Sequence, residues 1–561
     1  MSGASASRRE ILAGAGLLVL GVGVRLAYVL KYPTIAFSDF RALIDFGLAM
    51  RGGGWAAPTW HWIQFNPGIA MALSLVDAIF PDPETAARHA TAALTGFLPL
   101  FPFLLWRGIL SLSGRVGAGL FLVLWPGQIF FSGVVAQENW VLVPTVALGA
   151  LAVRVLRRPP ADSAASPIWA GILLAVAAAF RQEMLLVLIP AAVAAAGLFG
   201  TDPKRLSRAL ALVVSAAVPL LALAFQRHAA SGRFTIATEH GGLALLGAVV
   251  PGAAKAGWVD PRAHIAAVHP EFLENRTAAR RAAGHLALKE WKRRPAFQLL
   301  RAASVSGRLA VESDADSLYW SVGAPEALPE TLRPAGAGAY ARWFPRLRWE
   351  LALIQGLFVA SVLVAIRRRD AAILVLAACV MLKFALQSAA SPLGRLMMPA
   401  TALELLAIPL GLAALSPPAS RLRFGLVTAL VAAALLIAEP KLTAIAIAED
   451  ERPLPVARFP LEIAGAEGHV QCVVEDGEVA SLEWRRAWLR SVAEDRPARV
   501  RCRIDGDAQR LPLILRFEIP PGEPRETRLD GGLPSSGLEI TLTDAGGFSF
   551  SKATPATGST P

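Results

Sequence analysis

The chain has 561 residues, of which 54% are hydrophobic and only 17% are charged, whereas a soluble domain keeps about a quarter of its residues charged. Its formal net charge of +12 does not indicate nucleic acid as a partner, because much of the arginine stands between apolar runs and no basic stripe is interleaved with aromatic residues. This composition argues against a soluble protein and favours a membrane protein.

Eleven apolar runs follow one another along the chain, and several approach the roughly 20 residues that cross a bilayer. They predict an all-α, polytopic membrane protein, and Gly and Pro inside several runs are typical of membrane helices. The runs cover residues 10–30, 85–106, 116–131, 139–153, 167–180, 184–199, 207–226, 349–366, 371–388, 396–415 and 422–438.

Basic residues mark the connections between these runs and predict the orientation of the chain. With the N-terminus inside, every basic connection falls on the cytoplasmic side, as the positive-inside rule requires. Residues 31–84, residues 229–348 and the tail after residue 440 are then outside. The connections carry Arg107 and Arg115, Arg154 with Arg157 and Arg158, Lys204 with Arg205 and Arg208, Arg367 to Arg369, and Arg421 with Arg423.

The tail differs in pattern from the rest, which predicts two domains. Residues 1–440 read as the membrane domain, with outer loops at residues 31–84 and 229–348, whereas stretches such as residues 469–474 read as strands and turns. We expect residues 441–561 to form a small, β-rich extracytoplasmic domain with a disordered end. Cys472 and Cys502 fall in this domain, where a disulfide is possible if it lies outside the cytoplasm.

The first outer loop carries several candidate residues. Asp39, just beyond the first apolar run, is either an interfacial or helix-capping residue or a general base near the bilayer surface. Trp60 and its aromatic neighbours belong to an interfacial aromatic belt or stack on a sugar. His61 stands between two tryptophans, and such a lone histidine is more often structural than catalytic. Asn66 opens an Asn-Pro-Gly segment.

Charged residues recur at the predicted outer ends of later runs. Glu138 falls in a very short outer loop, where a carboxylate is costly unless it is wet, paired or used. Arg181 and Glu183 share the next outer turn, as a local ion pair or as functional residues. His240 precedes a pair of glycines, and glycine permits tight turns or close backbone approach.

Two cations stand near the outer leaflet late in the chain. Lys383 lies in the outer half of one run, and Arg395 opens the next. Such cations suit the phosphate or pyrophosphate of a lipid. The alternative is that they snorkel to the headgroups.

The order of these motifs resembles the GT-C class of polyprenyl-phosphate-sugar glycosyltransferases, in the style of the bacterial protein mannosyltransferase and aminoarabinose transferase group. The resemblance covers about residues 30–405. Asp39 and Glu138 match the acidic residues of the first and second outer loops, and Asn66-Pro67-Gly68 matches a Pro-Pro-x-Tyr-like segment. The stretch from Gly241 to Pro251 looks like a Gly-Gly…Gly-Asn…Pro motif, although Ala248 stands where many relatives have Asn.

This resemblance implies an inverting sugar transfer from a polyprenyl-phosphate donor to a glycan, lipid or protein acceptor. Asp39 would deprotonate the acceptor, and Glu138 would hold the acceptor or a cation. Because negative charge grows on the departing phosphate, preplaced cations would stabilise it. The expected site faces the periplasm at a bacterial inner membrane and needs no metal or cofactor. Its phosphate-binding candidates are Arg395, Lys383, His61 and His240, and its substrate-binding candidates are Trp60, Asn66, Arg181 and Glu183.

Two other functions stay open from the sequence. A transporter or flippase of lipid-linked sugars predicts ionisable residues near the bilayer midplane and broken helices related by a repeat. Glu404 is the one deep acidic candidate, and the halves show no repeat. An inactive relative whose tail binds an external partner is the third possibility.

Overall fold

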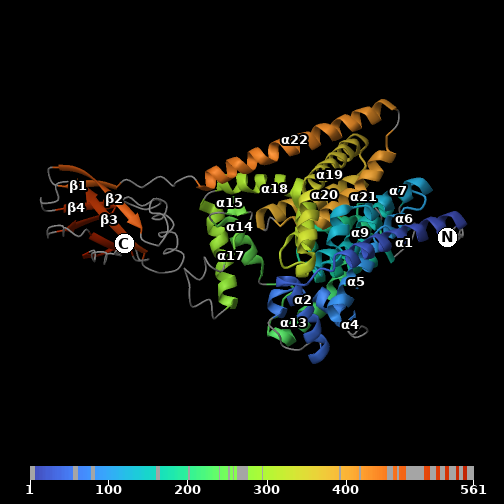
Figure 1. Cartoon of the computed structure of the whole chain (residues 1–561), viewed down its shortest axis with the longest axis horizontal. Helices are drawn as coiled ribbons and strands as arrows, with labels where there is room; N and C mark the ends of the chain where they lie inside the picture. The colour runs from blue at the N-terminus through green and yellow to red at the C-terminus, as the bar shows by residue number, and fades with distance from the viewer. Residues whose placement is uncertain are drawn as a thin grey trace. The chain divides into compact units, whose positions relative to one another are not determined.

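The computed structural model describes residues 7–451 with gaps at 55–60, 77–81, 159–164, 200–202, 239, 251–252, 257, 262–275, 294, 391–392 and 416–417, and beyond them the backbone of seven strands. The chain forms two compact units, Met1–Val259 with Ala287–Ile447, and Asp260–Leu286 with Ala448–Pro561. Figure 1 labels their elements. Each unit is described by itself, and the candidate site lies in the first.

Seven helical segments of the described residues are long and apolar enough to cross a membrane. Repeated segments of this kind are those of a multi-pass membrane protein. Four of the predicted runs are not among these seven, so the count of eleven spans stays a prediction. The seven segments contain α1 (Arg8–Lys31), α9 (Gln137–Arg157), α13 (Arg205–Ser231), α19 (Arg333–Arg368) preceded by η3 (Glu330–Leu332), α20 (Ala371–Ala390), η4 (Gly394–Met397) with α21 (Met398–Ala413), and α22 (Pro418–Glu451).

Other helices, most of them shorter, fill the connections between these segments. The early ones are α2 (Ser38–Gly53), α3 (His61–Gln64), α4 (Pro67–Val76), α5 (Pro83–Gly96), α6 (Leu100–Leu105), α7 (Leu112–Val123), α8 (Pro126–Phe131), α10 (Ala165–Phe180), α11 (Met184–Val187) and α12 (Ile189–Ala195). The later ones are α14 (His240–Val249), α15 (Ala253–Ala256), α17 (Arg276–Arg293), α18 (Pro295–Leu318) and the π-helical turn η2 (Tyr319–Gly323).

Proline divides some of the predicted runs. Pro99 separates α5 from α6, Pro126 begins α8, and Pro190 stands in the first turn of α12. Proline has no backbone N–H and clashes with the preceding turn, so it begins a helix readily but interrupts one that is already formed. Hydropathy alone therefore joined segments that the backbone separates.

The core of the first unit is built on α9 and α21, which lie side by side (Figure 1). About 78% of the apolar window of α9 and 89% of that of α21 are buried, against 11% for α13. Gly149 of α9 permits this approach, since a Cβ atom there would stand 2.8 Å from a methyl group of Leu403. A helix that is apolar all round is suited to such a central position, because each of its faces meets another helix.

The second unit carries a seven-stranded antiparallel sheet in the order β5-β4-β1-β2-β3-β6-β7. The register pairs residue 472 of β2 with residue 502 of β3, the two positions at which the sequence has cysteine. The disulfide stays a prediction. The strands are β1 (Phe459–Ile463), β2 (Ala466–Val474), β3 (Ala498–Asp505), β4 (Leu513–Phe517), β5 (Arg525–Leu529), β6 (Leu538–Leu542) and β7 (Phe548–Lys552).

Candidate functional site

A cavity of about 270 Å³ brings together candidate residues from five segments of the chain. Its volume is near the lower end of ligand pockets, which span about 300–1,000 Å³. The predicted site residues that line it are Asp39, Asn66, Glu138, Arg181, Glu183 and Arg395. Residues separated by more than 350 positions in the sequence therefore line one cavity.

Asp39 enters this cavity from the first turn of α2. The helix begins at Ser38, whose φ of 51° lies in the left-handed region that residues other than glycine rarely adopt. Strained backbone of this kind clusters at functional sites. Asp39 is half-buried, and its carboxylate has no hydrogen-bond or ion-pair partner among the described residues. It is therefore an available base on the cavity wall.

Asn66 reaches the cavity because of a close approach by its neighbour Gly68. A Cβ atom at Gly68 would stand 2.7 Å from the carbonyl oxygen of Ala179, next to the turn that carries Arg181. Only glycine permits this contact between α4 and α10. The Oδ1 atom of buried Asn66 accepts no hydrogen bond within the described part of the chain, so it is available to a ligand.

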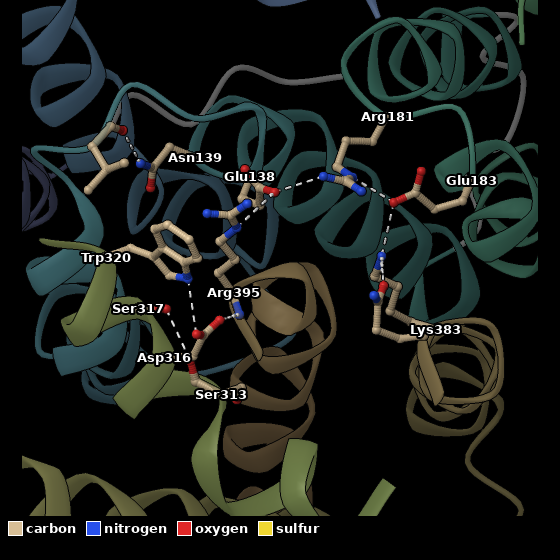
Figure 2. Close-up of polar contacts among 12 residues, drawn as sticks. Glu138, Asn139, Arg181, Glu183, Ser313, Asp316, Ser317, Trp320, Lys383 and Arg395 are labelled. Atoms are coloured by element: carbon tan, nitrogen blue, oxygen red, sulfur yellow. Dashed lines mark hydrogen bonds and ion pairs between the residues drawn. The ribbon is translucent and has the colours of Figure 1, made fainter. Parts of the chain in front are cut away.

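A chain of ion pairs (Figure 2) joins Lys383 to three residues of the cavity wall, Glu183, Arg181 and Glu138. Lys383 Nζ lies 3.1 Å from Glu183 Oε1, and Arg181 Nε lies 2.6 Å from the same oxygen. Arg181 Nη1 then reaches Glu138 Oε1 at 2.7 Å. Each of these cations thus has a carboxylate partner, and Glu138 and Glu183 are both neutralised. The sequence left open whether Arg181 and Glu183 form a local pair or serve the site, and the structure shows both the pair and their position on the cavity wall.

Arg395 stands at the other side of Glu138 and is held by stacking. Its guanidinium carbon lies 4.2 Å from the ring centre of Trp320 and 4.8 Å from that of Phe40. Its Nε is 4.0 Å from Glu138 Oε1, beyond hydrogen-bond distance. Arg395 is only 7% exposed, and its Nε and Nη1 have no hydrogen-bond partner among the described residues. Buried N–H donors without partners are costly, so this group is suited to an anion.

Asp316 fixes the backbone beneath this guanidinium. Its Oδ2 accepts the backbone N–H of Arg395 at 2.8 Å, and its Oδ1 accepts the indole N–H of Trp320 at 3.0 Å. The same carboxylate therefore positions both Arg395 and the ring that stacks on it (Figure 2). Burial raises the pKa of Asp316, and the charge of Arg395 opposes that rise.

Gly394 makes this arrangement possible. A Cβ atom there would lie 2.7 Å from Ser313 Cα and 2.9 Å from Asp316 Cβ, so any side chain would push η4 away from α18. The glycine requirement is one of close approach rather than of an unusual φ.

Sequence reasoning missed Asp316, Trp320 and the stacking role of Phe40. The spacing of Asp316 and Trp320 by four residues is a local signal, because side chains at this spacing meet on one helix face. Nothing local connects that pair with Arg395, which is 79 residues further along the chain.

The other predicted phosphate-binding residues have different surroundings. Lys383 is fully buried and contacts Glu183 and Gln387. The ring of His61 stacks on Phe46 with centroids 5.3 Å apart. Burial lowers the pKa of His61 although Asp45 opposes it. Its role in phosphate binding stays a prediction. Trp60 and the side chain of His240 lie outside the described part of the chain.

No known family model matches the sequence, and no curated protein is similar to it at a significant level. Among solved structures, the fold is similar to the archaeal oligosaccharyltransferase AglB from Archaeoglobus fulgidus, in complex with an inhibitory peptide and a dolichol-phosphate. The TM-score is 0.40, at 14% identity over 77% of this chain. The chain spans 56% of that protein's length, and a likeness of this size assigns no activity.

Proposed function

We propose that this chain is a membrane glycosyltransferase that moves a sugar from a polyprenyl-phosphate donor to an acceptor hydroxyl or amine, with inversion at the anomeric carbon. One observation carries the proposal. A carboxylate without a described partner, Asp39, and a buried guanidinium with two unpartnered nitrogen atoms, Arg395, line the same cavity. A base and an anion receptor are the two groups that such a transfer needs.

Asp39 is the proposed general base. Its carboxylate takes the proton of the acceptor as the acceptor oxygen or nitrogen attacks the anomeric carbon. The bond between that carbon and the phosphate oxygen breaks on the opposite side of the ring, which inverts the configuration. The bonding electron pair leaves on the phosphate oxygen. Since phosphate is a good leaving group, no strong general acid is required.

Arg395 is the proposed receptor for the charge that grows on this phosphate. Cation–π contacts with Trp320 and Phe40 and the cap by Asp316 fix its position before substrate binds. A hydrogen-bond donor that is already oriented needs no reorganisation as the charge develops, and this preorganisation is the main source of electrostatic catalysis. A guanidinium also presents two N–H groups to two phosphate oxygens.

Glu138 lies between the two arginines of the proposed site, Arg181 and Arg395. It is paired with Arg181 and lies 4.0 Å from the Nε of Arg395. Its negative charge favours the charged guanidinium at its side, while the pair with Arg181 restrains the carboxylate itself. In this proposal Glu138 positions cations and holds the acceptor, and Asn66 accepts a hydrogen bond from a substrate hydroxyl.

The proposed orientation follows from the basic connections in the sequence. The cavity belongs on the face opposite to those connections, which is the periplasmic face of a bacterial inner membrane. The proposed acceptor is a glycan, a lipid or a protein on that side.

The test is consumption of a panel of radiolabelled polyprenyl-phosphate sugars in membranes that contain the intact protein or Asp39→Asn. We expect the intact protein to consume one donor and the variant to lose about 10²–10⁴-fold in rate, the usual contribution of a general base. The rates are compared at equal amounts of folded protein. Asp45→Asn, on an exposed face of α2, is the matched control for the loss of a carboxylate.

A different result separates the alternative functions. If no donor is consumed but labelled donor moves between the leaflets, the chain is a transporter. If Asp39→Asn is as active as the intact protein, the proposed base is wrong.

A further inference from the structure

A second cavity, of about 280 Å³, lies beside the first in the same unit. It is formed by α18, η2, α19 and η4, and Asp316 and Gly394 are part of its lining. Arg395, the next residue after Gly394, lines the first cavity. The wall between the two cavities is therefore the segment that holds the proposed phosphate receptor.

Three aromatic rings line one side of this second cavity. Tyr319 and Tyr340 meet edge to face with centroids 5.9 Å apart, and Phe344 follows at 5.5 Å from Tyr340. Tyr319 is 37% exposed, so its ring is accessible to a ligand. Tyrosine combines a broad apolar face with a polar hydroxyl, and these two features suit the C–H faces and hydroxyl groups of a sugar ring.

Charged groups line the cavity too, and their charges nearly balance. Arg308 and Glu312 are 3.6 Å apart, and Glu312 is also 3.5 Å from Arg348. Arg348 in turn pairs with Glu439 at 2.7 Å. Among the lining residues that the structure describes, one arginine faces two carboxylates, Glu312 and Asp316. This balance disfavours an anionic ligand such as a phosphate, because the carboxylates would repel it.

The same groups disfavour an apolar chain. An isoprenoid or acyl chain would cover carboxylates and a guanidinium without offering them hydrogen bonds, which is costly. A neutral ligand rich in hydroxyl groups can donate hydrogen bonds to Glu312 and exchange them with the tyrosine hydroxyls.

We propose that this second cavity is a saccharide-binding subsite that holds the carbohydrate part of the acceptor. Its identification as the acceptor side rests on the proposed function, whereas saccharide binding does not. A sugar seated on Tyr340 and Glu312 lies across the wall from Arg395. The attacking hydroxyl or amine of the acceptor has to reach Asp39 in the first cavity, so this subsite holds a part of the acceptor that is remote from the reacting atoms.

Saturation-transfer NMR on the detergent-solubilised full chain tests binding without any turnover. The probes are free glucose, galactose, mannose, arabinose and N-acetylglucosamine. We expect a signal for at least one sugar and a dissociation constant that is about tenfold weaker in Tyr340→Ala, which corresponds to the loss of one good aromatic contact. Glu312→Gln weakens the same signal. Tyr340→Phe keeps the ring and retains most of the binding.

Controls separate this cavity from the first and from unfolding. Thr238→Ala, in the first cavity only, leaves the signal unchanged, and the melting temperature of Tyr340→Ala reports whether the chain still folds. If it unfolds, the milder Phe344→Leu takes its place. The proposal is overturned if no sugar gives a signal, or if the signal survives Tyr340→Ala and disappears in Thr238→Ala. Donor consumption by the intact protein is independent of all these outcomes.

Discussion

The two ends of the ion network differ in how their cations are satisfied (Figure 2). At one end, Lys383 and Arg181 share Glu183 at 3.1 and 2.6 Å, and Arg181 also pairs with Glu138. At the other end, Arg395 is held by rings and by a cap on its backbone, and two of its side-chain nitrogens have no described hydrogen-bond partner.

This difference distinguishes cations that are paired with carboxylates, Lys383 and Arg181, from a cation that is available to a ligand, Arg395. Buried charges that are fully paired hold helices together, and breaking one such pair leaves an uncompensated charge. Arg395 has Glu138 4.0 Å from its Nε but no described hydrogen-bond partner for Nε or Nη1, so these N–H groups are available to a ligand. Residue type alone does not distinguish the two cases, since Arg181 and Arg395 are both arginines on the wall of one cavity.

The largest effect at either end is expected from Arg395→Lys. Lysine keeps the charge but loses the planar guanidinium that lies over the rings of Trp320 and Phe40 and its fixed pair of N–H groups. We expect the rate at which the sugar donor is consumed to fall about 10²–10³-fold, which is the usual effect of removing a preorganised hydrogen-bond donor. The melting temperature should change little. Arg181→Lys is the matched comparison and should affect stability more than rate. Equal losses of rate in both variants would remove the distinction.

Gly394→Ala tests the positioning of the same guanidinium. The added methyl group pushes η4 from Ser313 and Asp316, which weakens the cap on Arg395. We expect about a tenfold loss of rate, since the interaction that is lost is of the order of one hydrogen bond. Gly338→Ala in α19 is the control, because no atom lies within 4 Å of the added methyl group. A variant with an unchanged rate would show that the close approach of η4 is dispensable.

Lys383→Met tests the paired end. It removes one of the two cations that contact Glu183, which keeps Arg181, so we expect a loss of about 1.5–3 kcal/mol in the free energy of unfolding, the usual contribution of a hydrogen bond to a charged group, with a smaller change in rate per folded molecule. Thermal denaturation in detergent measures the first quantity, and donor consumption normalised to folded protein measures the second. A loss of rate without a loss of stability would assign Lys383 to phosphate binding.

The acid dependence of stability sharpens this test. Burial raises the pKa of Glu183, but the charges of Arg181 and Lys383 outweigh burial and hold it well below its usual value. A carboxyl whose folded-state pKa is lowered contributes stability above its unfolded pKa of about 4.3 and loses it as the pH falls towards the folded value. In Lys383→Met the lowering is smaller, so the melting temperature should fall less steeply below about pH 4.3.

The smallest effect is expected from chelation of divalent metals. Glu138 and Glu183 are neutralised by Arg181 and Lys383, which leaves Asp39 as the cavity carboxylate without a described partner. One carboxylate is fewer than a protein usually offers a hard divalent cation. We expect the rate of donor consumption to be unchanged in EDTA. A rate that falls in EDTA and returns with Mg²⁺ or Mn²⁺ would contradict this expectation.

The sequence by itself determined the apolar segments and many of the cavity residues. Spanning length and hydropathy are local properties, so α9, α20 and α21 were predicted at nearly their observed positions. The cost of charge near a bilayer is local too, and it singled out Glu138 without any knowledge of its neighbours. Arg395 was singled out because a cation near the outer leaflet suits a lipid phosphate.

Only the tertiary structure decided which of these charges are paired. Lys383 meets Glu183 across 200 residues, and Asp316 meets Arg395 across 79. No periodicity of the sequence reports contacts between helices that are this far apart in the chain. Whether a cation is neutralised or kept for a ligand depends on such contacts, because an interaction between charges depends on distance and burial rather than on residue type.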